Sequence, residues 1–211
     1  RLSIQALAAA LLFHSGFIVY QFAIFGLDPT SMAAHRIAIA IQSMAFLPAV
    51  GFQAAAASVS GRLLGAGQKE QAQQSAWRAS FLGVLLILPV MVTFLFFARS
   101  LTGLFMIQES TAQIAAGCLM IGALEVPFLM VAESLTGSLR GAGANIPVMW
   151  ITAIGSWGLR VPFAWILGHG YLGFPDLGLY GVWVATVLDW VVRSLLFVVV
   201  ILRRRWLETK V

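Results

Sequence analysis

Six long apolar stretches, separated by short polar segments, run along this chain. They cover approximately residues 4–27, 37–60, 79–98, 112–138, 147–167 and 179–202. Each has the length of about 20 residues that an α-helix needs to cross a bilayer. None shows the short alternating pattern of a barrel strand. The pattern therefore predicts an all-α integral membrane protein in which six transmembrane helices form one transmembrane domain over residues 1–211.

Prolines interrupt four of the six spans. They are Pro48, Pro89, Pro127 and Pro162. A proline inside a helix removes one backbone hydrogen bond and tends to kink the helix. We expect a bundle that can bend.

The basic residues gather on one side of the spans. Counting crossings from the chain start, that side holds Arg1, Arg62, Lys69, Arg78, Arg140, Arg203, Arg204, Arg205 and Lys210. The opposite side holds Arg99, with Arg36 at a helix edge. Because cytoplasmic loops are enriched in Lys and Arg, both termini are predicted to lie in the cytoplasm, with the chain a multi-pass protein of the plasma (inner) membrane.

Composition narrows the class of partner. Hydrophobic residues make up 60% of the chain and charged residues 10%, against about 25% charged in soluble domains. Membrane lipid is therefore the expected surrounding. The net charge of +5 is not gathered into the basic face that nucleic-acid binding needs, so no nucleic-acid partner is expected.

Motifs for other functions are missing from the sequence. No Cys, His and acid cluster has metal-site spacing, no Ser–His–acid set can be recognised, and the single cysteine, Cys118, forms no intrachain disulfide. We expect neither a metal nor an enzyme. The chain starts at Arg1 and enters an apolar stretch at once, which suggests a piece of a longer protein.

A seven-residue motif occurs twice. GRLLGAG at 61–67 returns as GSLRGAG at 137–143. Glycines suit a helix end followed by a tight turn, and they also let neighbouring helices approach closely. The structural candidates are therefore Gly61, Gly65, Gly67, Gly137, Gly141 and Gly143.

Several of these segments together resemble a known family. MAAHRIA at 32–38, FLP at 46–48, GF at 51–52, AAAS at 55–58, the two glycine motifs and LDW at 188–190 resemble the second half of the multidrug and toxic compound extrusion (MATE) family. The resemblance implies a twelve-helix transporter of two six-helix lobes around a central cleft. This chain would supply helices seven to twelve, and the missing N-terminal lobe would be its partner.

The resemblance also implies a function. Such members export amphipathic, cationic drugs or toxic compounds by antiport with protons or sodium ions, without another cofactor. Sodium-coupled members carry acids in the seventh and tenth helices. Here Phe13 or His14 stands about at the first position and Leu129 at the second, with Glu125 and Glu133 flanking it.

Three alternatives stay open. One is a flippase for lipid-linked precursors of the same superfamily, which lines its cavity with several basic residues; this chain offers mainly Arg160 and Arg193. The others are a membrane-embedded enzyme, which needs a nucleophile or metal cluster at one depth, and a purely structural membrane subunit.

Ionisable residues inside the spans are the candidates for ion coupling, because such groups are costly in a membrane. They are Glu125, Glu133, His14 and Asp189. Each could instead serve a structural ion pair or hydrogen bond. Asp189 precedes Arg193 by four residues, the favourable order for a pair within one helix.

Polar and aromatic stripes identify the candidate substrate cleft. His14, Phe17 and Gln21 share one helix face by their spacing, as do Gln42, Phe46 and Gln53. Interhelical packing uses the same residue types. Phe128 and Arg160 complete the cleft candidates, with Arg160 expected to pair across helices and Glu125 its suggested partner.

Overall fold

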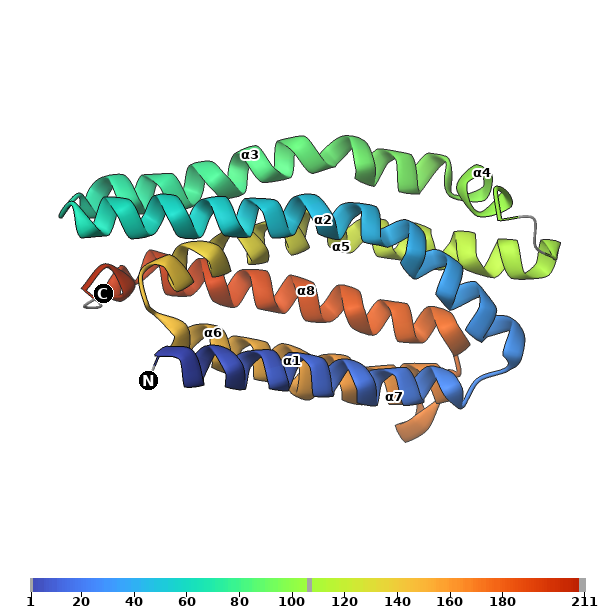
Figure 1. The fold of residues 1–211 in the computed structure, drawn as a ribbon. Coiled ribbons are helices and arrows are strands. Elements are labelled where there is room, and N and C mark those ends of the chain that lie inside the picture. The colour runs from blue at the N-terminus through green and yellow to red at the C-terminus, as the bar shows by residue number, and fades with distance from the viewer. Residues whose placement is uncertain (1, 106–107, 209–211) are drawn as a thin grey trace.

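The computed structural model describes residues 2–105 and 108–208, and its regular structure is entirely helical (Figure 1). The elements, in chain order, are α1 (Leu2–Phe25), α2 (Pro29–Gly65), α3 (Lys69–Phe96), α4 (Ala98–Gly103), α5 (Glu109–Gly141), α6 (Asn145–Ala153), the π-helical segment η1 (Ile154–Arg160), α7 (Val161–His169), the 3₁₀ turn η2 (Tyr171–Gly173), α8 (Gly178–Leu202) and the 3₁₀ turn η3 (Arg205–Glu208). Arg1 and Lys210, which were assigned to the basic side, lie outside the described residues.

The elements correspond to six passes along the bundle. Segments α6, η1 and α7 follow one another without a break and together form the fifth pass. Both ends of the chain lie at the same end of the bundle in Figure 1, as an even number of passes requires. Four helices (α2, α3, α5 and α8) are long and apolar enough to cross a membrane, and α1 contains a shorter apolar helix over 10–25. The all-helical membrane fold is confirmed.

Several helices are longer than the apolar spans. Helix α2 has 37 residues and so measures about 55 Å, whereas the hydrocarbon core is about 30 Å thick. Its start is defined by Asp28, whose Oδ1 accepts hydrogen bonds from the amides of Thr30 at 2.9 Å and Ser31 at 3.0 Å. Pro29 occupies the first helical position, where its missing N–H costs nothing. The helix therefore starts eight residues before the predicted span.

The six passes form layers (Figure 1). Helix α1 packs against the α6–η1–α7 run on one side, α8 lies in the middle, and α2, α5 and α3 lie on the other side. Helix α3 turns large apolar side chains outward, among them Phe81, Leu82 and Leu85. Such an exposed apolar row suits contact with lipid tails.

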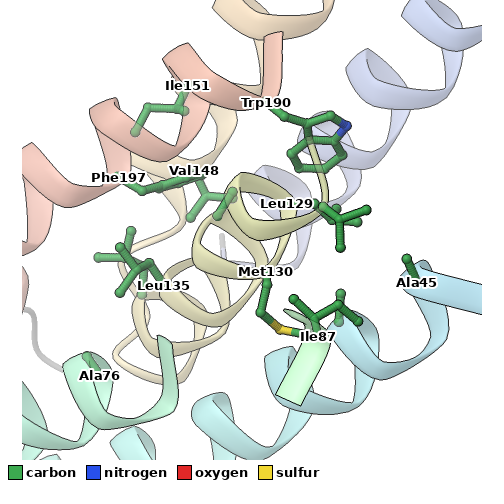
Figure 2. Close-up of a cluster of buried hydrophobic side chains, with 14 of the residues drawn as sticks. Ala45, Ala76, Ile87, Leu129, Met130, Leu135, Val148, Ile151, Trp190 and Phe197 are labelled. Atoms are coloured by element: carbon green, nitrogen blue, oxygen red, sulfur yellow. The ribbon is translucent and has the colours of Figure 1, made fainter. Parts of the chain in front are cut away.

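Helix α5 is at the centre of the main hydrophobic core (Figure 2). Its side chains Leu129, Met130 and Leu135 point in different directions toward the surrounding helices. The side chains that meet them come from α2, α3, α6 and α8: Ala45, Ala76, Ile87, Val148, Ile151, Trp190 and Phe197. The other elements are therefore held around α5.

The two glycine motifs fold in the same way. Gly67 and Gly143 adopt left-handed backbone conformations, with φ of 74° and 73°. In each copy an amide after the turn donates to a carbonyl five residues earlier: Gln68 to Leu63 at 2.8 Å, and Ala144 to Leu139 at 2.9 Å. These are the closures expected of a glycine-terminated helix.

The other motif glycines are not turn residues. Gly61 and Gly137 lie inside helices, and Gly65 and Gly141 are the last residues of theirs. A side chain on Gly137 would collide with the backbone of Gln53, whereas one on Gly65 would meet nothing within 4 Å. The turn interpretation is thus corrected for these positions: the helices continue through the motif, and Gly137 and Gly141 serve close packing.

Candidate functional site

The most buried charges form a three-residue group between α8 and η1. Asp189 and Arg193 lie one turn apart on α8, and Arg160 ends η1. The Nη2 atoms of Arg160 and Arg193 each lie 2.7 Å from Asp189 Oδ2, and Arg193 also donates through Nε to Oδ1 at 3.0 Å. The pair predicted within α8 is present, but its carboxylate serves two guanidiniums.

Local backbone structure makes room for this group. The π-helical segment precedes Pro162, which cannot donate to the usual carbonyl and whose ring crowds it. Gly155 in this segment faces the pair directly, since a Cβ there would lie 2.8 Å from Arg193 Nη2. The neighbouring Ser156 hydroxyl accepts from the same nitrogen at 3.2 Å. A side chain at position 155 would push η1 away from α8.

Arg160 does not have the partner expected from the sequence. Glu125 was the suggested partner, and the structure instead pairs Arg160 with Asp189. The guanidinium also stands over the rings of Tyr20 at 5.9 Å and Trp190 at 5.6 Å. Aromatic faces attract a cation, so the site holds Arg160 by rings as well as by its carboxylate.

A small enclosed cavity, here called the His35 cavity, lies beside this group. Its volume is about 40 Å³, and it is lined by Phe17, Tyr20, His35, Ile39, Gln42, Phe46, Glu125, Arg160, Trp183, Thr186 and Trp190. Glu125 is only 2% exposed. Its Oε1 accepts from the Gln42 amide at 2.5 Å. Its Oε2 has no hydrogen-bond partner among the described residues.

A larger cavity, here called the Glu133 cavity, lies nearer the end that holds the termini. Its volume is about 330 Å³, and it is lined by Ala10, Phe13, His14, Val50, Gln53, Glu133, Thr136, Arg140, Thr152, Arg193 and Phe197. Gln53 donates to the Glu133 carboxylate and accepts from Arg140 at 3.4 Å. Both signs of charge line this space.

The two cavities divide the candidate residues. The His35 cavity collects Phe17, Gln42, Phe46, Glu125 and Arg160. The Glu133 cavity collects His14, Gln53 and Glu133. Gln21 and Phe128 line neither of them, so the structure does not bring these two to the site. Asp189 stands between the cavities, bonded to one arginine from each.

Leu129 does not face a cavity. It is 0% exposed and belongs to the hydrophobic core around α5 (Figure 2). The position at which sodium-coupled relatives are expected to carry an acid is therefore filled by a packed apolar side chain here.

Sequence reasoning missed His35 as a site residue. It was placed at a helix end because the apolar run starts at residue 37, and solvation was the expected role. The structure buries it to 3% exposure. One signal was available: His35 and Gln42 are seven residues apart, which puts them on the same helix face.

Comparisons with known proteins agree with this architecture. A family model described as MatE matches residues 6–166. The probable multidrug resistance protein NorM of Thermotoga maritima is 28% identical over 194 residues, covering 92% of this chain and 41% of that protein. The multidrug resistance protein NorM of Photobacterium profundum is 28% identical over 181 residues, covering 85% of this chain and 39% of that protein.

Solved structures match the fold closely. A crystal structure described as MATE in complex with MaD3S has a TM-score of 0.85 and 25% identity over 93% of this chain and 43% of that one. Another, of MATE in the straight conformation, has a TM-score of 0.87 over 100% of this chain and 46% of that one, at 24% identity. The chain spans about two fifths of the length of the curated relatives that it matches.

Proposed function

The chain belongs to the MatE family, and on that premise we propose that it works as one six-helix lobe of a secondary antiporter. The transporter exports amphipathic, cationic drugs or toxic compounds and takes up protons in exchange. A second six-helix lobe supplies the other wall of the central cleft. The relatives named above as multidrug resistance proteins support this substrate class, and their length supports the second lobe.

Glu125 carries the proposal. It is a buried carboxyl with one oxygen held by Gln42 and the other without a partner. An ionised carboxyl in that state is unfavourable, because burial of an unsatisfied charge is costly. Binding a proton relieves this cost. Arg160, a fixed positive charge lining the same cavity, repels a sodium ion more than it hinders a proton that joins the carboxyl.

The flippase alternative is less well supported. It needs arginines free to bind a phosphate in the cavity. Arg160 and Arg193 are both bonded to Asp189 and buried with it. An anionic substrate would have to displace that carboxylate.

The proposed orientation follows from the bundle ends. The described basic residues at the end that carries both termini include Arg62, Lys69, Arg140 and the run 203–205. By the positive-inside rule this end is cytoplasmic, in the plasma (inner) membrane. The His35 cavity then lies toward the outside and the Glu133 cavity toward the cytoplasm.

The test is transport by the protein as the cell makes it, reconstituted in proteoliposomes with imposed proton or sodium gradients. Glu125→Gln should bind ethidium but fail to drive its uphill movement under a proton gradient. Glu109→Gln is the matched control, because Glu109 is 79% exposed at a bundle end. If Glu125→Gln accumulates ethidium like the wild type under the proton gradient, the coupling carboxyl is not Glu125, and Glu133 or His14 takes its place as the candidate.

A further inference from the structure

His35 is buried without satisfying its own polar atoms. It is 3% exposed, and neither ring nitrogen has a hydrogen-bond partner among the described residues. Its ring meets Tyr20 and Trp183 edge to face, with centroids 6.3 Å and 5.9 Å away. A buried polar group without a partner costs roughly 1–3 kcal/mol. Buried imidazoles are therefore expected to find a partner, and the rings around this one offer none.

The same cavity contains other polar atoms in the same situation. Besides the two nitrogens of His35, they are Glu125 Oε2, Arg160 Nε and Trp183 Nε1. All four side chains line the His35 cavity, and they come from α2, α5, η1 and α8. A buried water needs roughly 10–15 Å³ of such space and two to four polar partners. A cavity of about 40 Å³ therefore has room for a few water molecules.

The geometry gives this cluster a direction. His35 and Gln42 lie about 10 Å apart along one face of α2, and Gln42 holds the carboxylate of Glu125. His35 is six residues from the start of α2, whereas Glu125 is in the middle of α5. His35 is thus nearer to the end of the bundle opposite the termini, where α1 turns into α2 (Figure 1).

We propose that His35 and Glu125 exchange protons through a small cluster of bound water, and that His35 connects this cluster to the α1–α2 end of the bundle. One ring nitrogen accepts a proton from water at that end. The other nitrogen releases its proton to the cluster, which passes one to the Glu125 carboxylate. The imidazole returns to its starting tautomer, so that one proton moves for each cycle and no other bond changes. This inference rests on the proposed function, since it takes Glu125 as the coupling carboxyl.

Charged and titratable groups from every neighbouring element act on His35. They are Tyr20 from α1, Asp28 and Arg36 from the start of α2, Cys118 and Glu125 from α5, Arg160 from η1, and Asp189 from α8. Glu125 lines the cavity itself, and Asp189 is bonded to both arginines beyond it. Among the groups around the cavity, Glu125 is the carboxylate with an oxygen left to take up a proton.

The first experiment measures proton-driven ethidium efflux by the whole protein in proteoliposomes. His35→Ala should lower the rate on the order of 100-fold, the scale at which a positioned proton-transfer group acts, while ethidium binding stays within about twofold. Added imidazole should restore the rate, whereas thiazole, which has a similar shape but is a very weak base, should not. A merely structural role predicts equal rescue by both molecules. His169→Gln is the control histidine, because His169 bonds the carbonyl of Ala23 outside this cavity.

The second experiment detects the water directly. X-ray radiolytic footprinting in ¹⁸O water labels side chains beside bound water, so Trp183 should be labelled in the wild type and much less in His35→Phe, whose ring fills the space. An unlabelled Trp183 in the wild type shows a dry cavity and overturns the proposal.

The two experiments separate this inference from the proposed function. If Glu125→Gln loses proton coupling while His35→Ala keeps the wild-type rate, the proposed function stands and the role of His35 is wrong. If Glu125→Gln keeps coupling, the proposed function fails at that residue, and the proton exchange proposed here fails with it. Loss of coupling in both variants with rescue by imidazole alone supports the full proposal.

Discussion

Replacing the glycines between α2 and α5 should separate the most extensive helix contact of the fold. Gly137 and Gly141 lie one turn apart on α5 and face the backbone of α2. A Cβ on Gly137 would lie 2.9 Å from Gln53 Cα, and one on Gly141 would lie 2.9 Å from Ala57 Cα. The carbonyl oxygens of the same two residues would be closer still. Backbone atoms cannot move aside as the tip of a side chain can.

The magnitude follows from these distances. Carbon atoms pack best at about 3.5–4.0 Å, so either alanine requires α2 and α5 to move apart by about 0.6–1.1 Å. A gap of 0.5–1 Å forfeits about a quarter to a half of each dispersion contact along the interface, and overpacking typically costs about 1–3 kcal/mol. Alanine returns at most about 1 kcal/mol through its higher helix propensity. The net change is a loss of stability.

The assay is unfolding of the purified protein in detergent, followed by the exposure of buried Cys118 to a thiol-reactive dye. Gly137→Ala and Gly141→Ala should each lower the unfolding midpoint. Gly51→Ala in α2 is the control: its Cβ would meet nothing within 4 Å, so it should leave the midpoint unchanged or raise it. An interface alanine that is as stable as the Gly51 variant would refute the close-packing argument.

Four further outcomes are expected. Asp189→Asn should cost about 3–5 kcal/mol in an unfolding titration, because two buried guanidiniums lose their shared carboxylate; a smaller loss than that of an exposed acid would contradict it. Gly143→Ala should cost about 1–2 kcal/mol, since its φ of 73° is left-handed, and Gly143→Asn should cost less in the same thermal melt. Asp28→Ala should lose about 1 kcal/mol of helix capping at neutral pH. Hydrogen bonds from the hydroxyl and amides at the start of α2 lower the pKa of Asp28 below its ordinary 3.8, so melts across pH should show this difference above about pH 4 and lose it as the pH falls through the lowered pKa. Single cysteines at Lys69 and Asp176 should be labelled from opposite sides of the membrane, the first from the cytoplasm; labelling of both from one side would refute the six-pass topology.

The six passes could be read from the sequence because apolar runs report bilayer thickness directly. Helix ends could not, because a helix that leaves the bilayer keeps its hydrogen bonds in water. The start of α2 shows the difference. The Asp28-Pro29 pair was a readable start signal, with a capping side chain before a proline at the first helical position, yet it lies outside the apolar run and was passed over.

The candidate site was less predictable, since its contacts join different helices. Spacing rules cover residues on one helix, which is why the pair of Asp189 with Arg193 was foreseen. No such rule places Arg160 relative to α8. Its partner depends on how η1 faces α8, and that depends on a π-helical segment and on Gly155, whose missing side chain allows the approach. Assigning Asp189 to one arginine also hid its capacity to bind two.

The position of the two cavities explains why polar side chains could be tolerated inside this lobe. Both lie at one junction, between α1 with the α6–η1 run on one side and α2, α5 and α8 on the other. Asp189 bonds Arg160 across that junction, and Arg193 bonds Ser156 across it as well. The two layers are therefore joined by buried charges and hydrogen bonds between two separate hydrophobic clusters. A junction built this way moves only if its charges stay paired, so a change in the charge of Glu125 beside it would act on the contact that holds the layers together.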